Sequence, residues 1–136
     1  MKFFYLMKDP LGSGDVKLGI TSFNSALTRL GVYQNSYSAK SHIATFDRLW
    51  FGQDNPIKEL EKTLKNRFGY AIEREGRGFS EWISEREDII VKTINETIQG
   101  YHYHVYSASD YPVNIYTIEP LIERLTATSN DTIIHT

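Results

Sequence analysis

Three residues near the N-terminus have side chains that together suit chemistry on a phosphodiester: Tyr5, Lys17 and Arg29. A tyrosine hydroxyl can act as a general base toward water if its pKa, about 10 in a free side chain, is lowered. A neighbouring lysine can stabilise the phenolate, or take its proton directly if desolvation keeps the amine neutral. An arginine guanidinium stabilises charge that builds on phosphorus oxygens in the transition state. The structural alternative is an aromatic at the core edge, a solvated strand lysine and a helix-surface arginine.

Two short strands are expected to position the first two of these residues. Residues 2–7 form an apolar, aromatic run typical of a buried strand, and turn-forming residues follow at 9–15. Residues 16–21 alternate, so that Lys17 and Gly19 share one face. We expect an antiparallel hairpin, in which the glycine leaves room for a close approach to the backbone.

A short helix is expected to carry Arg29. A cap at residues 21–22 precedes it, and its inner stripe consists of Ala26, Leu27 and Leu30. Arg29 lies off that stripe. Gly31 is expected to end the helix, which leaves Tyr33 in the following loop.

The rest of the chain predicts a third strand at residues 43–51 and further helices. Asp54-Asn55-Pro56 starts a helix with an apolar stripe of Ile57, Leu60, Leu64 and Phe68. Ser84 and Glu87 match a capping box before a helix at 85–99, with a buried side of Ile89, Ile90, Ile94 and Ile98. Residues 101–106 alternate like a strand, residues 121–126 suit one or two helical turns, and the chain is expected to fray from residue 127.

Composition predicts a single intracellular, cytoplasmic domain. The chain has 136 residues, and it has no cysteine, which excludes disulfides and thiolate zinc sites. No apolar run is long enough for a signal peptide or a membrane span. The net charge is −2, with twelve Lys/Arg against eight Asp/Glu in residues 1–77 and three against nine in residues 78–136. A basic front could meet phosphates while an acidic back faces away, although ordinary unevenness of surface charge is the simpler alternative.

Several short motifs, in their order and spacing, resemble the GIY-YIG nuclease superfamily. Phe3-Phe4-Tyr5 matches the first half of the name motif and Lys17-Leu18-Gly19 the second, and Arg29 follows in a helix. Glu61-Lys62-Thr63-Leu64 resembles the segment with the family's metal-binding glutamate, and Phe79-Ser80-Glu81-Trp82 a signature of phage-type and virus-type members. The resemblance covers about residues 1–83. It implies an α+β fold with a three-stranded antiparallel sheet flanked by helices, and leaves residues 84–136 as an extension on the same domain.

The resemblance assigns roles to individual residues. It implies that Tyr5 is the general base, Lys17 its tuning partner and Arg29 the clamp on the transition state. Lys17 departs from the tyrosine of most members, although some restriction enzymes of the superfamily look like they use lysine. Tyr33 falls where members carry His or Tyr to bond a phosphate or support the water; the alternative is an aromatic packed over the helix.

The resemblance also implies a metal and further contacts to substrate. Glu61 would bind Mg²⁺ or Mn²⁺, which accepts a single protein carboxylate when waters and phosphate oxygens complete its shell. Glu59 is a rival on another helix face, and pairing of Glu61 with Lys58 or Lys65 is the structural alternative. Gly19 and His42 are the candidate substrate-binding residues, His42 being otherwise a polar loop residue.

The leading hypothesis is therefore a small, metal-dependent DNA endonuclease of the phage or virus type. The runner-up is a non-catalytic nucleic-acid-binding or regulatory module on the same fold, which the modest basicity favours. A third hypothesis is an interaction protein with a tyrosine-rich tail that mediates dimerisation. Because residues 84–136 are acidic, specificity for DNA would come from loops 34–42 and 69–80 or from a partner protein.

Overall fold

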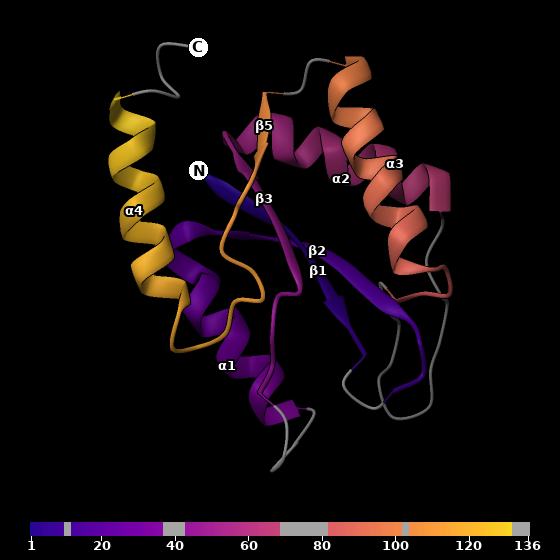
Figure 1. Cartoon of the computed structure of the whole chain (residues 1–136), viewed down its shortest axis with the longest axis horizontal. Coiled ribbons are helices and arrows are strands. Elements are labelled where there is room, and N and C mark those ends of the chain that lie inside the picture. The colour runs from indigo at the N-terminus through magenta and orange to yellow at the C-terminus, as the bar shows by residue number, and fades with distance from the viewer. Residues whose placement is uncertain (10–11, 37–42, 69–81, 102–103, 132–136) are drawn as a thin grey trace.

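A five-stranded antiparallel sheet forms the centre of the computed structural model, which describes residues 1–9, 12–36, 43–68, 82–101 and 104–131 (Figure 1). The strand order is β4-β2-β1-β3-β5. The strands are β1 (Lys2–Lys8), β2 (Val16–Ser22), β3 (Arg48–Gly52), β4 (Trp82–Ile83) and β5 (Val105–Ser107). The prediction of an α+β fold with an antiparallel sheet is confirmed. The predicted number of three strands was too low, because the short strands β4 and β5 extend the sheet at its two edges.

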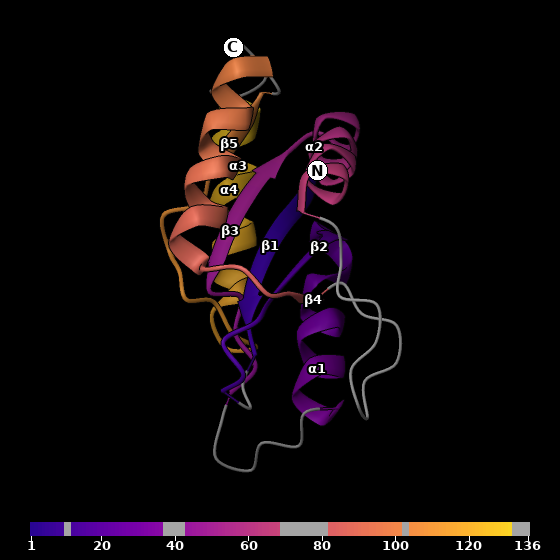
Figure 2. The same cartoon turned by 90° about the vertical axis from the view of Figure 1, so that its right-hand side faces the viewer.

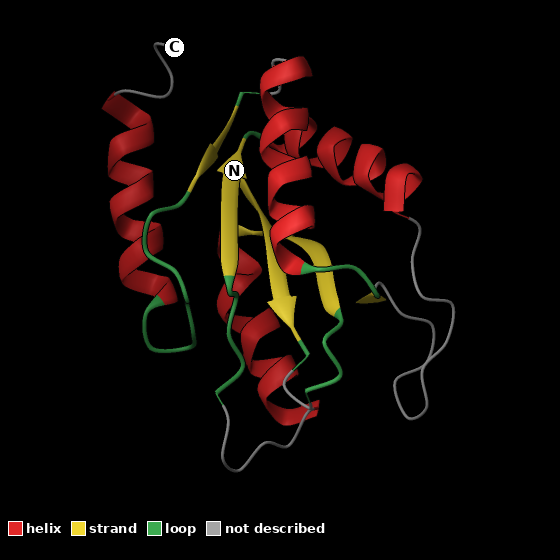
Figure 3. Ribbon diagram, turned by 45° about the vertical axis from the view of Figure 1, so that its right-hand side comes forward, coloured by secondary structure: helices red, strands yellow, loops and turns green. Residues whose placement is uncertain are grey.

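Helices cover both faces of this sheet (Figures 1 and 3). The helices are the 3₁₀ turn η1 (Phe23–Ser25), α1 (Ala26–Ser36), α2 (Asp54–Phe68), α3 (Glu87–Tyr101) and α4 (Ile118–Asp131). The cores place η1, α1 and α4 on one face, called here the tyrosine face, and α2 and α3 on the other, called the aliphatic face. In Figure 2, α1 and α2 lie toward the β2 side of the sheet and α3 and α4 toward the β5 side.

The sequence of β1 reflects this two-sided burial. Residues 3–7 are all buried, because odd positions point into the tyrosine face and even positions into the aliphatic face. Both cores also include residues beyond position 84, such as Leu121 in one and Ile94 in the other. The described parts of the C-terminal stretch therefore pack on the same sheet as the N-terminal elements.

Helix boundaries differ from the prediction in three places. Gly31 does not end α1, which runs through it to residue 36. The Ser84 hydroxyl donates to the buried Asp15 carboxylate (2.9 Å), and α3 begins only at Glu87, two residues later than predicted. The short helix expected at 121–126 is the middle of the fourteen-residue α4, which continues past the expected fraying point.

The predicted third strand was too long at its start. Phe46 lies outside β3 and forms an isolated bridge with Val113, and β3 begins two residues later. The buried stripe of α3 was also partly wrong, because Ile89 is 38% exposed and Thr93 and Thr97 are buried. Their hydroxyls donate to the carbonyl oxygens of residues 89 and 93, one turn earlier, which satisfies them inside the helix.

Candidate active site

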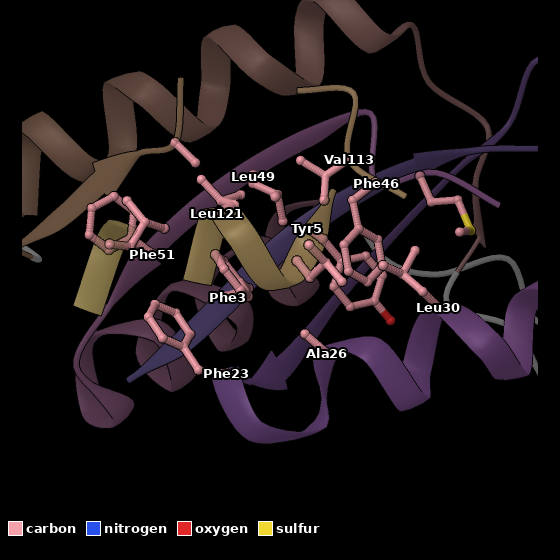
Figure 4. Packing of buried hydrophobic residues seen from close by; sticks show 14 of the residues in the cluster. Phe3, Tyr5, Phe23, Ala26, Leu30, Phe46, Leu49, Phe51, Val113 and Leu121 are labelled. Carbon is pink, nitrogen blue, oxygen red and sulfur yellow. The ribbon is translucent and has the colours of Figure 1, made fainter. Parts of the chain in front are cut away.

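Two buried tyrosine hydroxyls lie at the centre of the candidate site. The hydroxyl oxygens of Tyr5 on β1 and Tyr33 on α1 are 2.5 Å apart, and the two side chains are only 2% and 6% exposed. The Tyr5 ring stacks on Phe46 at a centroid distance of 4.3 Å and meets the Tyr33 ring edge-on. Figure 4 shows Tyr5 beside Phe46, with Leu30 of α1 nearby. A hydrogen-bonded polar pair is thus held inside an aromatic core.

Sequence analysis placed Tyr33 in a loop, and this was wrong. The helix continues past Gly31, so the apolar spacing Ala26, Leu30, Tyr33 turns the tyrosine toward the core. That spacing of four and three residues is the signal in the sequence that could have indicated that Tyr33 faces the core. Phe46 was expected only as part of the predicted strand at residues 43–51, and nothing in the sequence indicated that its ring would stack on Tyr5.

Gly19 makes room for the Tyr5 hydroxyl. The two residues are directly paired between β1 and β2, so they share a face of the sheet. A Cβ atom at position 19 would lie 2.5 Å from the Tyr5 oxygen and 2.6 Å from its Cζ, well inside contact distance. The close approach that the sequence predicted at Gly19 therefore comes from the chain's own tyrosine.

Lys17 lies on the same face of β2, two residues before Gly19. Its ammonium lies 5.2 Å from the centroid of the Tyr33 ring, a distance typical of a cation–π contact. The lysine is half-buried. It therefore brings positive charge beside the tyrosine pair.

Arg29 lies one helical turn before Tyr33 on α1 and is exposed. Across the described part of the chain, its guanidinium makes no hydrogen bond or ion pair. A guanidinium in this state can bind an incoming anion without first breaking a protein contact.

Glu61 lies on α2, which packs on the aliphatic face, and so it comes from the other side of the sheet than the tyrosines. Its side chain is 18% exposed, and Lys65 approaches it at 3.9 Å, the helical pairing named above as the structural alternative. Within the described ranges no three His, Cys, Asp or Glu side chains gather as a metal site. Mg²⁺ is a hard cation that prefers oxygen ligands, and a single carboxylate such as Glu61 is enough when substrate and water supply the remaining oxygens.

Several predicted features lie wholly or partly outside the described residues. His42 and the segment 69–81 are among them, and these include most of the Phe79 to Trp82 signature. Residue Trp82 itself belongs to β4, where its backbone pairs with Lys17. Trp82, the last residue of the signature, therefore lies in the strand next to Lys17.

A second charged cluster, which sequence analysis missed, joins β1, β3 and α3. Glu87 accepts hydrogen bonds from the side chains of Lys8 (2.8 Å) and Arg48 (3.2 Å). The hydrogen bond between Glu87 and Lys8 raises the pKa of Lys8. The backbone N–H of Lys8 donates to Asp47 at 2.7 Å, yet burial raises the pKa of the Asp47 carboxyl. The cluster fastens the start of α3 to the sheet.

No protein-family model, curated protein or solved structure matches this chain. In the described ranges, no helix combines the length and the apolar composition needed to cross a bilayer.

Proposed function

We propose that this protein is a metal-dependent DNA endonuclease of the GIY-YIG type, which hydrolyses phosphodiester bonds. The observation that carries the proposal is the hydrogen-bonded pair of Tyr5 and Tyr33, seated on Gly19 with Lys17 beside it. Tyr5 comes from β1 and Lys17 and Gly19 come from β2, the two strands to which the resemblance assigns them, whereas Tyr33 comes from α1 and not from the expected loop. Gly19 leaves room for both the ring and the hydroxyl of Tyr5, so that the tyrosine pair fits beside β2 without a clash.

In this proposal each residue acts through a contact within its reach. The Tyr5 phenolate takes a proton from the attacking water, and the Tyr33 hydroxyl stabilises that phenolate by donating to it. The Lys17 charge beside the pair favours the ionised form. Arg29, on the exposed side of α1, binds the phosphate and stabilises the charge that develops on it.

Glu61 is the residue proposed to hold the metal. When bound, Mg²⁺ or Mn²⁺ would neutralise charge on the leaving oxygen. Helices α1 and α2 pack on opposite faces of the sheet, but both lie toward its β2 side (Figure 2). In this proposal the phosphate therefore binds at that side of the sheet, where Arg29 contacts it from α1 and the metal on Glu61 contacts it from α2. The Lys65 contact at 3.9 Å is long and carried by a flexible side chain, so this contact opposes metal binding only weakly.

The burial of the tyrosines favours a second candidate, a nucleic-acid-binding or regulatory module without catalysis. A general base must be within reach of water, and the Tyr5 side chain is 2% exposed. In a binding module, the pair would only fix α1 on the sheet while Arg29 contacts phosphate. This candidate predicts binding of DNA without any cleavage.

Cleavage of DNA tests the proposal. Supercoiled plasmid and branched DNA are incubated with the wild-type protein and Mg²⁺ or Mn²⁺, beside Arg29→Ala and Glu61→Ala. Arg67→Ala and Glu59→Ala, exposed residues of α2, are the matched controls. We expect nicking by the wild type and both controls, and a loss of about 100-fold or more in the two site variants. Cleavage that survives both site substitutions, or DNA binding without cleavage under every condition, overturns the endonuclease proposal.

A further inference from the structure

A groove runs between α1 and α4, on the surface of the tyrosine face. It has a volume of about 350 Å³ and is lined by Phe23, Asn24, Leu27, Glu119, Ile122 and Glu123. We call it the α1–α4 groove. Figure 1 shows the two helices that form its walls on the same side of the sheet.

The floor of the α1–α4 groove is apolar. Leu27, expected from the sequence to be buried, is 38% exposed, and Ile122 beside it is half-buried. Phe23 closes the floor and packs on Phe3 of the core at 4.4 Å between ring centroids. A partner that covered these side chains would remove apolar surface from water, which favours binding.

One wall of the α1–α4 groove is negatively charged. Glu119 and Glu123 are exposed and lie one turn apart on α4, and none of the described residues that line the groove is Lys or Arg. Residues 78–136 as a whole carry nine Asp/Glu against three Lys/Arg. The groove therefore complements a ligand that offers apolar side chains together with positive charge.

A second copy of this chain offers a poor match. On the described helices, the other strongly exposed aliphatic side chains are Val32 and Ile89. The cations nearest Ile89 along α3, Arg86 and Lys92, are paired with carboxylates of their own segment. Val32 has only Arg29 within one turn on its N-terminal side, a single charge against two carboxylates.

We propose that the α1–α4 groove binds a basic amphipathic helix of another protein. Its apolar side chains would cover Leu27 and Ile122, and its Lys or Arg residues would face Glu119 and Glu123. A helix laid into an apolar groove with a charged rim is a common mode of peptide recognition. The proposal stands whether or not the chain cleaves DNA, because none of these residues belongs to the candidate active site.

Two synthetic peptides test this proposal. One is a labelled helix with Leu at every third or fourth position and Lys elsewhere, and the other has Glu in place of each Lys. Fluorescence anisotropy is measured with the wild type, with Leu27→Ser, and with the double variant Glu119→Gln/Glu123→Gln. Val32→Ser, on the same helix but outside the groove, and Glu96→Gln, exposed on α3, are the matched controls.

We expect only the Leu/Lys peptide to bind, with about tenfold weaker affinity in both groove variants, equivalent to about 1.4 kcal/mol, and little change in the controls. Equal binding of both peptides, no binding of either, or equal loss in the controls overturns the proposal. Sedimentation of the unliganded protein adds a further check, since a dimer that Leu27→Ser dissociates would assign the groove to a second copy instead. If Leu27→Ser unfolds by circular dichroism, the Glu double variant decides the outcome alone.

Discussion

The two faces of the sheet are buried to a similar extent but are built differently. The aliphatic face joins residues such as Leu18, Leu60 and Ile94, and the ring nitrogen of its buried Trp50 donates to Asn95 at 3.1 Å. The tyrosine face encloses two hydroxyls that bond each other, and a lysine lies at its border. Burying polar groups costs free energy unless they are paired, so apolar residues would have packed this face more simply.

This difference separates stability from chemistry within one sheet. If the tyrosine face exists for function, its polar residues contribute modestly to stability and strongly to activity. The aliphatic face should show the reverse. The substitutions below test this division, beginning with the largest expected change in stability.

Truncation of the aliphatic face should cost the most stability. Leu60 is fully buried on α2, so Leu60→Ala should lower the free energy of unfolding by about 2–5 kcal/mol. Urea denaturation measures this, with Lys62→Ala, exposed on the same helix, as the unaffected control. The cleavage rate per folded molecule should not change. If the cleavage rate of fully folded Leu60→Ala protein is lower than that of wild type, the two faces do not separate stability from activity.

Filling the space under the tyrosine pair should cost less stability but also cost activity. In Gly19→Ala the new Cβ would lie 2.5 Å from the Tyr5 oxygen, so the ring must move. We expect the free energy of unfolding to fall by about 1–3 kcal/mol and DNA cleavage to be lost. Gly31→Ala is the control, because a Cβ there meets nothing within 4 Å inside a helix. It should stabilise the protein by about 0.5–1 kcal/mol. Equal stability of the two variants would show that the ring adapts freely.

Removal of one hydroxyl of the pair should have a smaller effect on stability. Tyr33→Phe deletes the 2.5 Å hydrogen bond and should cost about 0.5–1.5 kcal/mol. A double-mutant cycle with Tyr5→Phe, followed by thermal unfolding, measures the coupling between the hydroxyls. Tyr116→Phe, at 73% exposure, should be neutral. Strict additivity of the two single changes would mean that the hydroxyls do not interact.

The smallest effects should be those of pH on exposed or partly buried carboxyls. Burial raises the folded-state pKa of Asp47, so its contribution to stability is present at low pH and is lost as pH rises through that pKa. Asp47→Asn should therefore be more stable than wild type at pH 7, and the gap should close near pH 3, below the ordinary carboxyl pKa of about 3.9.

Asp54→Asn should behave in the opposite sense. The N-terminal ammonium lies 3.1 Å from this carboxylate and lowers its pKa. The contribution of this contact to stability is therefore present above the ordinary carboxyl pKa and is lost as pH falls. Urea denaturation at both pH values measures the two variants together. The same sign for both would contradict the assigned contacts.

Local signals were enough to predict the central strands and the amphipathic helices. Residues 2–7 form a continuous apolar run, and the residues from Ile57 to Phe68 have a clear helical periodicity, so both elements could be predicted without tertiary contacts. Strand β5 (Val105–Ser107) was predicted in part, since residues 101–106 alternate like a strand. Strand β4 could not be predicted, because two residues have no periodicity of their own and pair only where a neighbouring strand offers an edge. The end of α1 was missed because packing of Tyr33 outweighs the local preference of Gly31.

The candidate site was predicted as a set of residues but not as a geometry. The hairpin register brings Tyr5 opposite Gly19, which alternation alone implies once the turn length is known. The contact between Tyr5 and Tyr33 depends on how α1 crosses the sheet, and no local pattern encodes that. The sequence also did not indicate that the helix with Glu61 packs on the opposite face.

The most direct test of the account is the single-turnover rate of DNA cleavage by Tyr5→Phe compared with wild type, at saturating Mg²⁺ and matched folded fraction. This change keeps the ring that stacks on Phe46 and removes only the hydroxyl. If that hydroxyl is the general base, the rate should fall by about 100-fold or more while the protein remains folded. An unchanged rate in the folded variant would contradict the account.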